Sequence, residues 1–109
     1  MAVRIYGVGQ TAVGKLGRPA TTLMQEALQT ALADAGLELD ELDGLVASPS
    51  LSEPRFMEAH YLSTRIGMLP NRGVRVRTID TGGAGPISAL LEATRMVKME
   101  GCTAVAVVA

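Results

Sequence analysis

The sequence predicts an α/β fold in which a mostly parallel sheet is flanked by helices. Short apolar segments typical of strands alternate along the chain with longer segments that have helical periodicity. This alternation favours a parallel sheet, because each helix carries the chain back to begin the next strand in the same direction. The last apolar segment, Thr103–Ala109, is continuous, which indicates a strand covered by helices on both faces.

Composition and charge argue against several classes of protein. The 109 residues are 48% hydrophobic and 19% charged, as expected for one small globular domain. A net charge of −1 provides no general attraction to nucleic acids or anionic membranes, and the 3% of aromatic residues argue against base stacking. We therefore expect neither a nucleic acid nor a membrane as partner. The single cysteine, Cys102, excludes an intramolecular disulfide and fits a reducing compartment such as the cytoplasm.

The first predicted strand is Val3–Gly9, and a loop follows it. Residues Gly7–Ala12 imitate the G-x-G-x-x-A fingerprint of dinucleotide-binding proteins. That motif requires a helix to open at its second glycine, whereas Gly14, Gly17 and Pro19 indicate a loop. A structural turn is the better interpretation, and we reject nucleotide binding for this reason.

The first helix is predicted to begin at Thr21–Thr22 and to end at Gly36, which supplies a left-handed stop. Thr22 and Gln25 match a capping box. Apolar residues at helical spacing form a stripe that we expect to face the core. The stripe comprises Met24, Leu28, Ala31 and Ala35, with Leu32 beside it.

An acidic connector, a strand and a second helix follow. The connector 37–43 carries four carboxylates but no glycine-centred calcium loop, so we expect no metal site. Gly44–Ser48 is the second predicted strand. The second helix is predicted to start at Ser52–Pro54 and to end at Gly67, with His60 as a surface or interface residue rather than a catalytic one. Its expected inner stripe is Phe56, Ala59, Leu62 or Ser63, and Ile66.

The most informative stretch runs from a strand through a glycine-rich turn into a helix. The strand Gly73–Ile79 has two different faces, and Asp80–Gly85 then places three glycines in four residues. Pro86 suits the first turn of a helix, and Gly101 suits its end. The residues expected to share the inner helix face are Ile87, Leu90, Leu91, Thr94 and Val97.

Two interpretations of the turn remain open. Gly82–Gly85 can present backbone N–H groups, from Gly83, Ala84 and Gly85, to a cavity, because the first helical turn has no intrahelical acceptors for them. Alternatively, the glycines only avoid clashes in a tight turn, and Asp80 or Thr81 caps the helix.

Three blocks together resemble the N-terminal part of a thiolase, closest to the sterol-carrier-protein type. They are Val3–Gly9 with the following Gln10–Lys15; Leu32–Leu37 with Leu42–Leu45; and Ala89, Ala93 and Gly101 with the apolar strand beyond. The resemblance covers residues 1–109 and implies a partial thiolase-like N-terminal domain, because a complete thiolase is several times longer. It also implies a layered αβαβα fold.

The resemblance implies a site without its usual nucleophile. In thiolases a cysteine lies at this turn in a pattern like C-x-S-G-x-x-A, where the helix N-terminus lowers the thiol pKa. Aligning Ala89 puts Gly83 at the cysteine position, and aligning Gly85 puts Gly82 there. Cys102 lies at the far end of the helix, so it is interpreted as a packing residue.

The implied function is thiolase-like action on acyl-CoA thioesters, as acyl transfer resembling that of acetyl-CoA acetyltransferases or as carbon–carbon bond cleavage or formation. The coenzyme A thioester would be the substrate, with no covalently bound cofactor. One alternative is a non-catalytic thiolase-like subunit or binding module. Another is a cysteine-independent CoA-thioester aldolase that works with a small partner protein. The resemblance also implies a homodimer through strand 73–79, in which Arg75 and Arg77 would need partners across the two-fold axis.

Overall fold

The computed structural model describes residues 2–14 and 17–109. Its helices are α1 (Ala20–Ala35), α2 (Glu58–Arg65) and α3 (Gly85–Glu100), its strands are β1 (Gly44–Ala47), β2 (Arg75–Thr78) and β3 (Val105–Val108), and two single 3₁₀ turns are η1 (Leu39–Glu41) and η2 (Gly82–Ala84). From α1 onward, the helices and strands alternate in the order that the sequence predicts.

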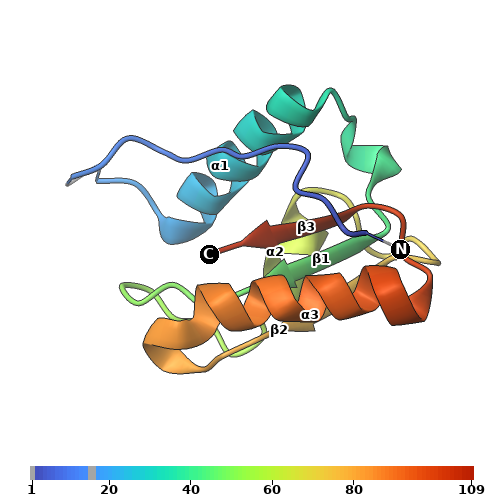
Figure 1. The fold of residues 1–109 in the computed structure, drawn as a ribbon. Coiled ribbons are helices and arrows are strands. Elements are labelled where there is room, and N and C mark those ends of the chain that lie inside the picture. The colour runs from blue at the N-terminus through green and yellow to red at the C-terminus, as the bar shows by residue number, and fades with distance from the viewer. Residues whose placement is uncertain (1, 15–16) are drawn as a thin grey trace.

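The three strands form one parallel sheet in the order β2-β1-β3, with β1 in the centre. Helices α1 and α2 cover one face of the sheet, and α3 covers the other (Figure 1). Leu45 points to the α1 and α2 side, whereas Val46 points to α3, and both are fully buried. The predicted class, α/β with a parallel sheet flanked by helices, is therefore confirmed.

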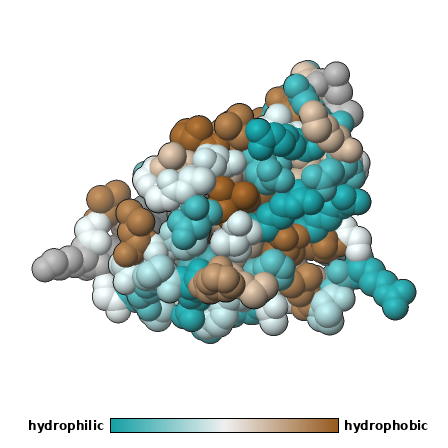
Figure 2. Space-filling model, turned by 90° about the horizontal axis from the view of Figure 1, so that it is seen from below, coloured by the Kyte–Doolittle hydropathy of each residue, from teal (hydrophilic) through white to brown (hydrophobic). Residues whose placement is uncertain are grey.

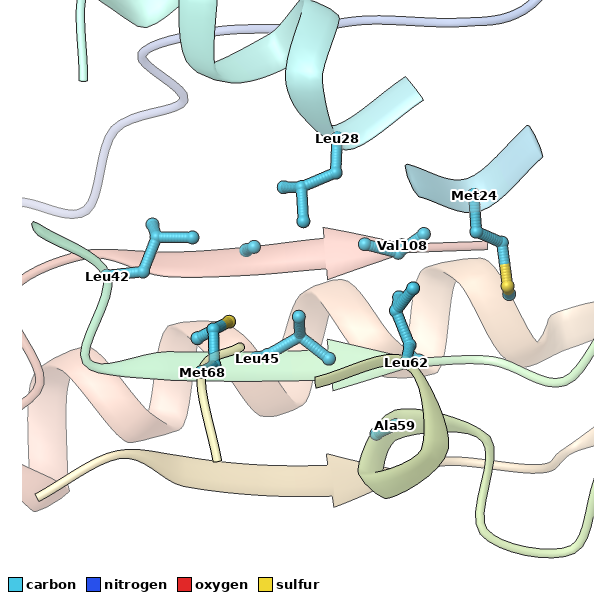
Figure 3. Packing of buried hydrophobic residues seen from close by; sticks show 10 residues of the cluster. Met24, Leu28, Leu42, Leu45, Ala59, Leu62, Met68 and Val108 are labelled. Atoms are coloured by element: carbon cyan, nitrogen blue, oxygen red, sulfur yellow. The ribbon is translucent and has the colours of Figure 1, made fainter. Parts of the chain in front are cut away.

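The larger core cluster lies between the sheet and the pair α1 and α2 (Figure 3). Leu28 of α1 and Leu62 of α2 both contribute to it, together with Val108 of β3. Met24 and Leu28 are buried as predicted, whereas Ala31 and Ala35 are only partly buried. The core stripe of α1 is therefore confirmed for its N-terminal half.

The predicted strand Val3–Gly9 is wrong, because residues 2–13 form no regular element. This segment runs along α1 instead of joining the sheet (Figure 1). A Cβ atom on Gly9 would lie 2.5 Å from the carbonyl oxygen of Ala27, so this close approach requires glycine. The Val8 N–H donates to Asp34 Oδ2 at 2.9 Å. The alternating apolar residues of the predicted strand are typical of strands, but a strand also needs a neighbouring strand with which to form a hydrogen-bonded ladder.

The predicted capping box of α1 is also wrong. The helix begins one residue earlier, with Pro19 at the N-cap position and no capping bond from a side chain of the cap residue. The Ala20 N–H instead donates to Oε1 of Glu53, at 2.8 Å, and Glu53 lies in the loop that precedes α2. At the other end, Gly36 has φ of 70° and stops the helix as predicted.

Helix α2 begins later than predicted, at Glu58 rather than at Ser52–Pro54. The Ser50 hydroxyl accepts hydrogen bonds from the N–H groups of residues 52 and 53, at 3.2 and 3.3 Å, and so stabilises a turn there. Phe56 consequently lies outside the helix and is 97% exposed, contrary to prediction. Ala59 and Leu62, from the expected inner stripe, are fully buried.

The inner face of α3 differs from the predicted one. Small residues, Ala89 and Ala93, face the sheet together with Met96, whereas Ile87 is 65% exposed and Leu91 is 53% exposed. Of the predicted face, Val97 does pack against this core cluster. Small side chains let the helix approach the sheet closely, so the longer apolar residues lie on its outer side. Figure 2 views the molecule from below and shows several separate apolar patches among hydrophilic side chains.

The arginines of β2 bind acidic residues of α3 within the same chain. Arg77 contacts Glu100 through two bonds, at 2.8 and 2.6 Å, and Glu92 at 3.1 Å. Arg75 also contacts Glu100, at 3.0 Å. The hydrogen bond from Arg77 holds the pKa of the Glu100 carboxyl below its usual value. The expectation that these arginines need partners across a two-fold axis is therefore wrong.

Asp43 joins the start of β1 to the start of β3. Its carboxylate accepts hydrogen bonds from the Thr103 N–H at 2.8 Å, from the Thr103 hydroxyl at 3.0 Å and from the Ala104 N–H at 3.0 Å. Burial raises the pKa of Asp43, but these hydrogen bonds lower it by more, so the pKa lies below its usual value.

The lowered pKa of Asp43 predicts a pH-dependent contribution to stability. Asp43→Asn should lower the free energy of unfolding by about 1–2 kcal/mol at pH 7, because it weakens bonds to a charged acceptor. The stabilisation is fully present above the unfolded-state pKa of about 3.9 and is lost as pH falls through the lower folded-state pKa. Urea unfolding of both proteins from pH 7 to pH 2.5 should therefore show the difference shrinking in acid.

Asp40→Asn is the matched control, because Asp40 is an exposed neighbour in the same acidic connector. It should change the free energy of unfolding by less than about 0.5 kcal/mol at every pH. A difference between wild type and Asp43→Asn that stays constant down to pH 2.5 would contradict the role given to the Asp43 charge.

Candidate functional site

The carboxyl ends of the strands and the N-terminus of α3 lie at one edge of the sheet. Ser48 follows β1, Thr78 ends β2, and η2 leads directly from β2 into α3. In Figure 1 this edge is on the left, where the strand arrows point and α3 begins. Open parallel α/β sheets bind ligands outside the carboxyl ends of their strands. This edge is therefore the candidate site, and it contains the predicted residues Gly82–Gly85.

The glycine turn matches neither sequence interpretation completely. The Gly85 N–H donates to the Gly82 carbonyl oxygen, so Gly85 does not present a free donor, contrary to expectation. Asp80 Oδ1 accepts from the Gly82 N–H, at 3.3 Å, but neither N-cap residue caps its helix with its own side chain. The Thr81 hydroxyl instead donates to the Ser88 hydroxyl of α3, at 3.0 Å. In the described part of the chain, no side-chain oxygen accepts from Gly83 or Ala84. A 3₁₀ turn uses the N–H groups at its C-terminal end for its own hydrogen bonds. Gly83 is therefore a better candidate than Ala84 to donate an N–H to a ligand.

The space around the turn is open on the side of Gly82 and Gly83. A Cβ atom at either position would meet nothing within 4 Å, although the φ of 63° at Gly82 itself favours glycine. Pro86 lies in the first turn of α3, as predicted. Two surface hollows lie elsewhere, one between α1 and η1 and the other between η1 and residues 67–74. The turn thus faces open space rather than either of these hollows.

Gly85 has a different reason to be glycine. A Cβ atom at this position would overlap the hydroxyl oxygen of Ser48, which lies against the first residue of α3. Ser48 is 5% exposed, and its N–H donates to the Val108 carbonyl oxygen at 2.9 Å. No hydrogen bond of the Ser48 hydroxyl is found within residues 2–14 and 17–109. Ser48 is not among the site residues predicted from the sequence. Its place directly after a buried strand is the signal that could have identified it, because ligands bind at the carboxyl ends of such strands.

Glu58, another residue that sequence reasoning missed, is a fully buried carboxyl group at the same edge. Its Oε1 accepts a long hydrogen bond of 3.4 Å from the Ser50 N–H, and its Oε2 lies 3.8 Å from Arg55 Nε. Oε2 accepts no hydrogen bond from the described residues. The next N–H, of Ala59, donates to the Thr78 hydroxyl at 3.0 Å. The start of α2 is thereby fixed to the carboxyl end of β2.

The side chains of the single histidine and the single cysteine form no hydrogen bond with the turn among the described residues. His60 is half-buried in α2, and its Nδ1 has no partner among the described residues. Cys102 is buried beyond the C-terminal end of α3, about 24 Å of helix away from the turn at 1.5 Å per residue. Burial raises the pKa of the Cys102 thiol, which leaves it a poor nucleophile. Cys102 therefore packs in the core, as expected.

Two further features concern ligands and membranes. Across residues 2–14 and 17–109, no group of three His, Cys, Asp or Glu side chains is arranged to hold a metal ion. No helix within these ranges has the length and apolar character needed to cross a membrane.

Comparison with known proteins supports the fold. No family model matches the sequence, and no curated protein matches it. One similar solved structure is 3-oxoacyl-[acyl-carrier-protein] synthase III from Aquifex aeolicus VF5, with a TM-score of 0.69 and 24% sequence identity. The similarity covers 83% of this chain and 29% of that chain. The chain therefore has a thiolase-like α/β fold and spans less than a third of the length of the synthase.

Proposed function

We propose that this protein binds acyl-CoA thioesters at the carboxyl edge of its sheet and acts on them in a thiolase-like manner. The observation that carries this proposal is the open glycine turn at the N-terminus of α3, within a thiolase-like fold. The similar structure is by name a synthase of 3-oxoacyl groups on acyl carrier protein. For the present protein, the proposed reaction is acyl transfer resembling that of acetyl-CoA acetyltransferases. We place this reaction in lipid metabolism and in the cytoplasm.

The turn offers a donor where a thioester needs one. The Gly83 N–H lies at the N-terminal end of a 16-residue helix, whose dipole favours negative charge at that end. A carbonyl oxygen bound there would be stabilised as it gains negative charge, by roughly 3 kcal/mol for one good donor. Gly82, Ala84 and Gly85 would shape the turn around this donor.

Glycine at the cysteine position of the thiolase pattern excludes an acyl-cysteine at this turn. Gly82 or Gly83 occupies that position, and Cys102 lies at the other end of α3. Direct acyl transfer, or carbon–carbon bond cleavage or formation without an acyl-enzyme, is compatible with the turn. A cysteine-independent CoA-thioester aldolase with a small partner protein fits equally well. A non-catalytic thiolase-like subunit would bind the thioester without turnover, so a turnover assay separates it from both enzymes.

The outer face of α3 fits the layered arrangement implied by the thiolase resemblance, closest to the sterol-carrier-protein type. A helix between two sheets needs apolar residues on opposite faces. Ala89 and Met96 face the sheet, whereas Ile87 and Leu91 lie exposed on the other side. A second half of a thiolase-like protein would cover them in an αβαβα arrangement.

A homodimer through strand 73–79 is part of the same proposal. Within the described sheet, β2 pairs only with β1 and has one free edge. The Arg75 N–H donates to Asp43 and the Ile79 N–H to Ala47, each at 3.0 Å, so odd-numbered residues point to β1. The N–H of Val76 therefore points to the free edge. Because Arg75 and Arg77 are neutralised within the chain, their charges do not oppose pairing with a second copy.

Gly83→Ala tests the binding site directly. The fold should tolerate it, because nothing lies within 4 Å of the added Cβ and the backbone φ is not positive. The methyl group would enter the space proposed for the thioester and weaken acetyl-CoA binding by roughly tenfold, the equivalent of one lost hydrogen bond. Calorimetric titration measures the affinity, and thermal unfolding confirms that the fold is intact. An unchanged acetyl-CoA affinity would mean that the turn has only a structural role.

No acyl group should accumulate on cysteine. After incubation with radiolabelled acetyl-CoA and proteolysis, the peptide that contains Cys102 should carry no label, because this thiol is buried and its pKa is raised. Denatured protein treated with a thiol reagent provides the positive control for detection of the peptide. Stoichiometric label on Cys102 in the native protein would contradict the proposal.

Val76→Pro tests the dimer without breaking the sheet. It removes an N–H that faces the free edge of β2, a position where proline is tolerated in edge strands. Sedimentation equilibrium should show weaker dimerisation, with a dissociation constant raised by roughly tenfold, the effect of one lost hydrogen bond. Arg77→Pro is the matched control, because it removes an N–H that faces β1 and should unfold the protein instead. A monomeric wild type, or an unchanged constant in a folded Val76→Pro, would exclude this interface.

A further inference from the structure

Glu58 is a fully buried carboxylate with one oxygen that accepts no hydrogen bond. It is the first residue of α2, and its Oε1 accepts a long bond of 3.4 Å from the Ser50 N–H. Its Oε2 has no hydrogen-bond donor among the described residues. Buried polar groups are normally hydrogen-bonded, and a buried charge without a donor is costly. Packing alone therefore does not account for a carboxylate at this position.

The nearby cation, Arg55, stacks on a tyrosine ring instead of donating to this oxygen. Arg55 Nε lies 3.8 Å from Glu58 Oε2, which makes an ion pair but is too long for a hydrogen bond. The guanidinium carbon lies 3.9 Å from the centroid of the Tyr61 ring, and Tyr61 is 38% exposed. A cation–π contact at an exposed ring is weaker than a charge-assisted hydrogen bond to a buried carboxylate. The stronger partner of Arg55 is thus only about 1 Å beyond hydrogen-bond distance.

The loop 49–57 that carries Arg55 is anchored on both sides of this residue. Glu53 Oε1 accepts a hydrogen bond from the first N–H of α1, at 2.8 Å. The Met57 carbonyl oxygen accepts one from an N–H of α2, at 3.0 Å. Between these anchors, the side chain that follows Arg55 is 97% exposed. Residues 54–56 can therefore shift while both anchors stay in place.

We propose that residues 54–56 are a strap: Arg55 closes it by leaving the tyrosine ring and donating its Nε–H directly to Glu58 Oε2. The arrangement described above is the open state, in which the stacking is retained and Oε2 has no donor. The closed state gives the buried oxygen its donor and releases the ring. This state is favoured by the stronger bond and opposed by the entropy lost when the strap is ordered.

The strap lies at the edge of the sheet that contains the candidate site. Its loop begins directly after Ser48, whose hydroxyl oxygen lies where a Cβ atom of Gly85 would be. In Figure 1 the loop leaves the sheet at the same end at which α3 begins. Closing the strap therefore moves part of a loop that borders this edge. The proposal does not depend on which ligand binds there, so it stands or falls separately from the proposed function.

Exchange of the Arg55 Nε–H proton with water measures the closed state. A proton donated to a buried oxygen is protected from water, whereas one stacked on an exposed ring is not. In nitrogen-labelled protein, NMR should show this proton exchanging about tenfold more slowly in wild type than in Glu58→Gln, the effect of one hydrogen bond. Glutamine keeps an oxygen for the Ser50 N–H but removes the charge. Arg55→Lys, which lacks the Nε–H group, assigns the resonance.

Cleavage by trypsin after Arg55 gives a second measurement on the native protein. Its rate follows the population in which the strap is open, because the protease must capture the arginine side chain. Glu58→Gln should raise this rate about tenfold and leave cleavage after Arg72, which is exposed in the turn before β2, unchanged. Glu53→Gln is the matched control, since it removes a carboxylate from the same loop but keeps an oxygen for α1. It should change neither rate.

Tyr61→Leu tests the open state and remains informative if Glu58→Gln fails to fold. Without the ring the open state loses its stacking contact, so exchange of the Arg55 Nε–H and cleavage after Arg55 should both slow, by about two- to fivefold. Thermal unfolding establishes which variants are folded. Faster cleavage in folded Tyr61→Leu would mean that the ring alone holds Arg55, and equal exchange rates in wild type and folded Glu58→Gln would mean that Arg55 does not bond to Oε2. Either result overturns the strap.

Discussion

The close packing of α3 on the central strand is the constraint on which the candidate site depends. Gly85 has no space for a side chain, because the Ser48 hydroxyl lies where its Cβ would be. Further along α3, Ala89 and Ala93 keep the helix near Val46, which is fully buried on this face. A larger residue at any of these contacts would push the helix away from the sheet, since cores tolerate little added volume. The position of the helix N-terminus at the carboxyl edge therefore follows from small residues.

The same constraint gives the glycines of the turn two separate roles. Gly85 is required by packing, and its N–H is used within η2, whereas Gly83 has open space on its side and no contact that requires glycine. The φ of 63° makes Gly82 a conformational requirement. Gly83 is thus the position at which glycine is best explained by a bound ligand rather than by contacts within the protein. This separation is what allows a single methyl group to probe ligand binding without disturbing the fold.

The sequence predicts the order and the type of the elements well wherever residues that are close together along the chain determine them. Gly36 and Gly101 both adopt the left-handed conformation that stops a helix, and the glycine turn lies between β2 and α3 as expected. The sequence fails where a distant segment decides the outcome. Val3–Gly9 has the composition of a strand but lies on α1, where no strand ladder is available to it among the described residues.

The prediction of the site was limited for the same reason. The glycine turn is visible in the sequence because its residues are contiguous. Ser48, by contrast, follows β1 and meets Gly85 only in the folded structure, and Glu58 belongs to α2, whose start is fixed to the carboxyl end of β2. Periodicity also placed the larger apolar residues of α3, such as Ile87, against the sheet, although the alanines face it. Hydrophobic periodicity identifies faces of a helix, but the size of its residues decides which face approaches a sheet most closely.

A helix N-terminus can support thioester chemistry even where no nucleophile occupies it. In the thiolase pattern the positive end of the helix stabilises a thiolate, and the same field acts on any negative charge placed there. Under the proposed function, glycine would stand in place of that cysteine, and the charge that this field would stabilise is that on the substrate oxygen. A turn that lacks the thiol but keeps its N–H groups would, under the proposed function, polarise a thioester carbonyl rather than accept its acyl group. The binding of a thioester, rather than acylation of the protein, is therefore the property that tests the site most directly.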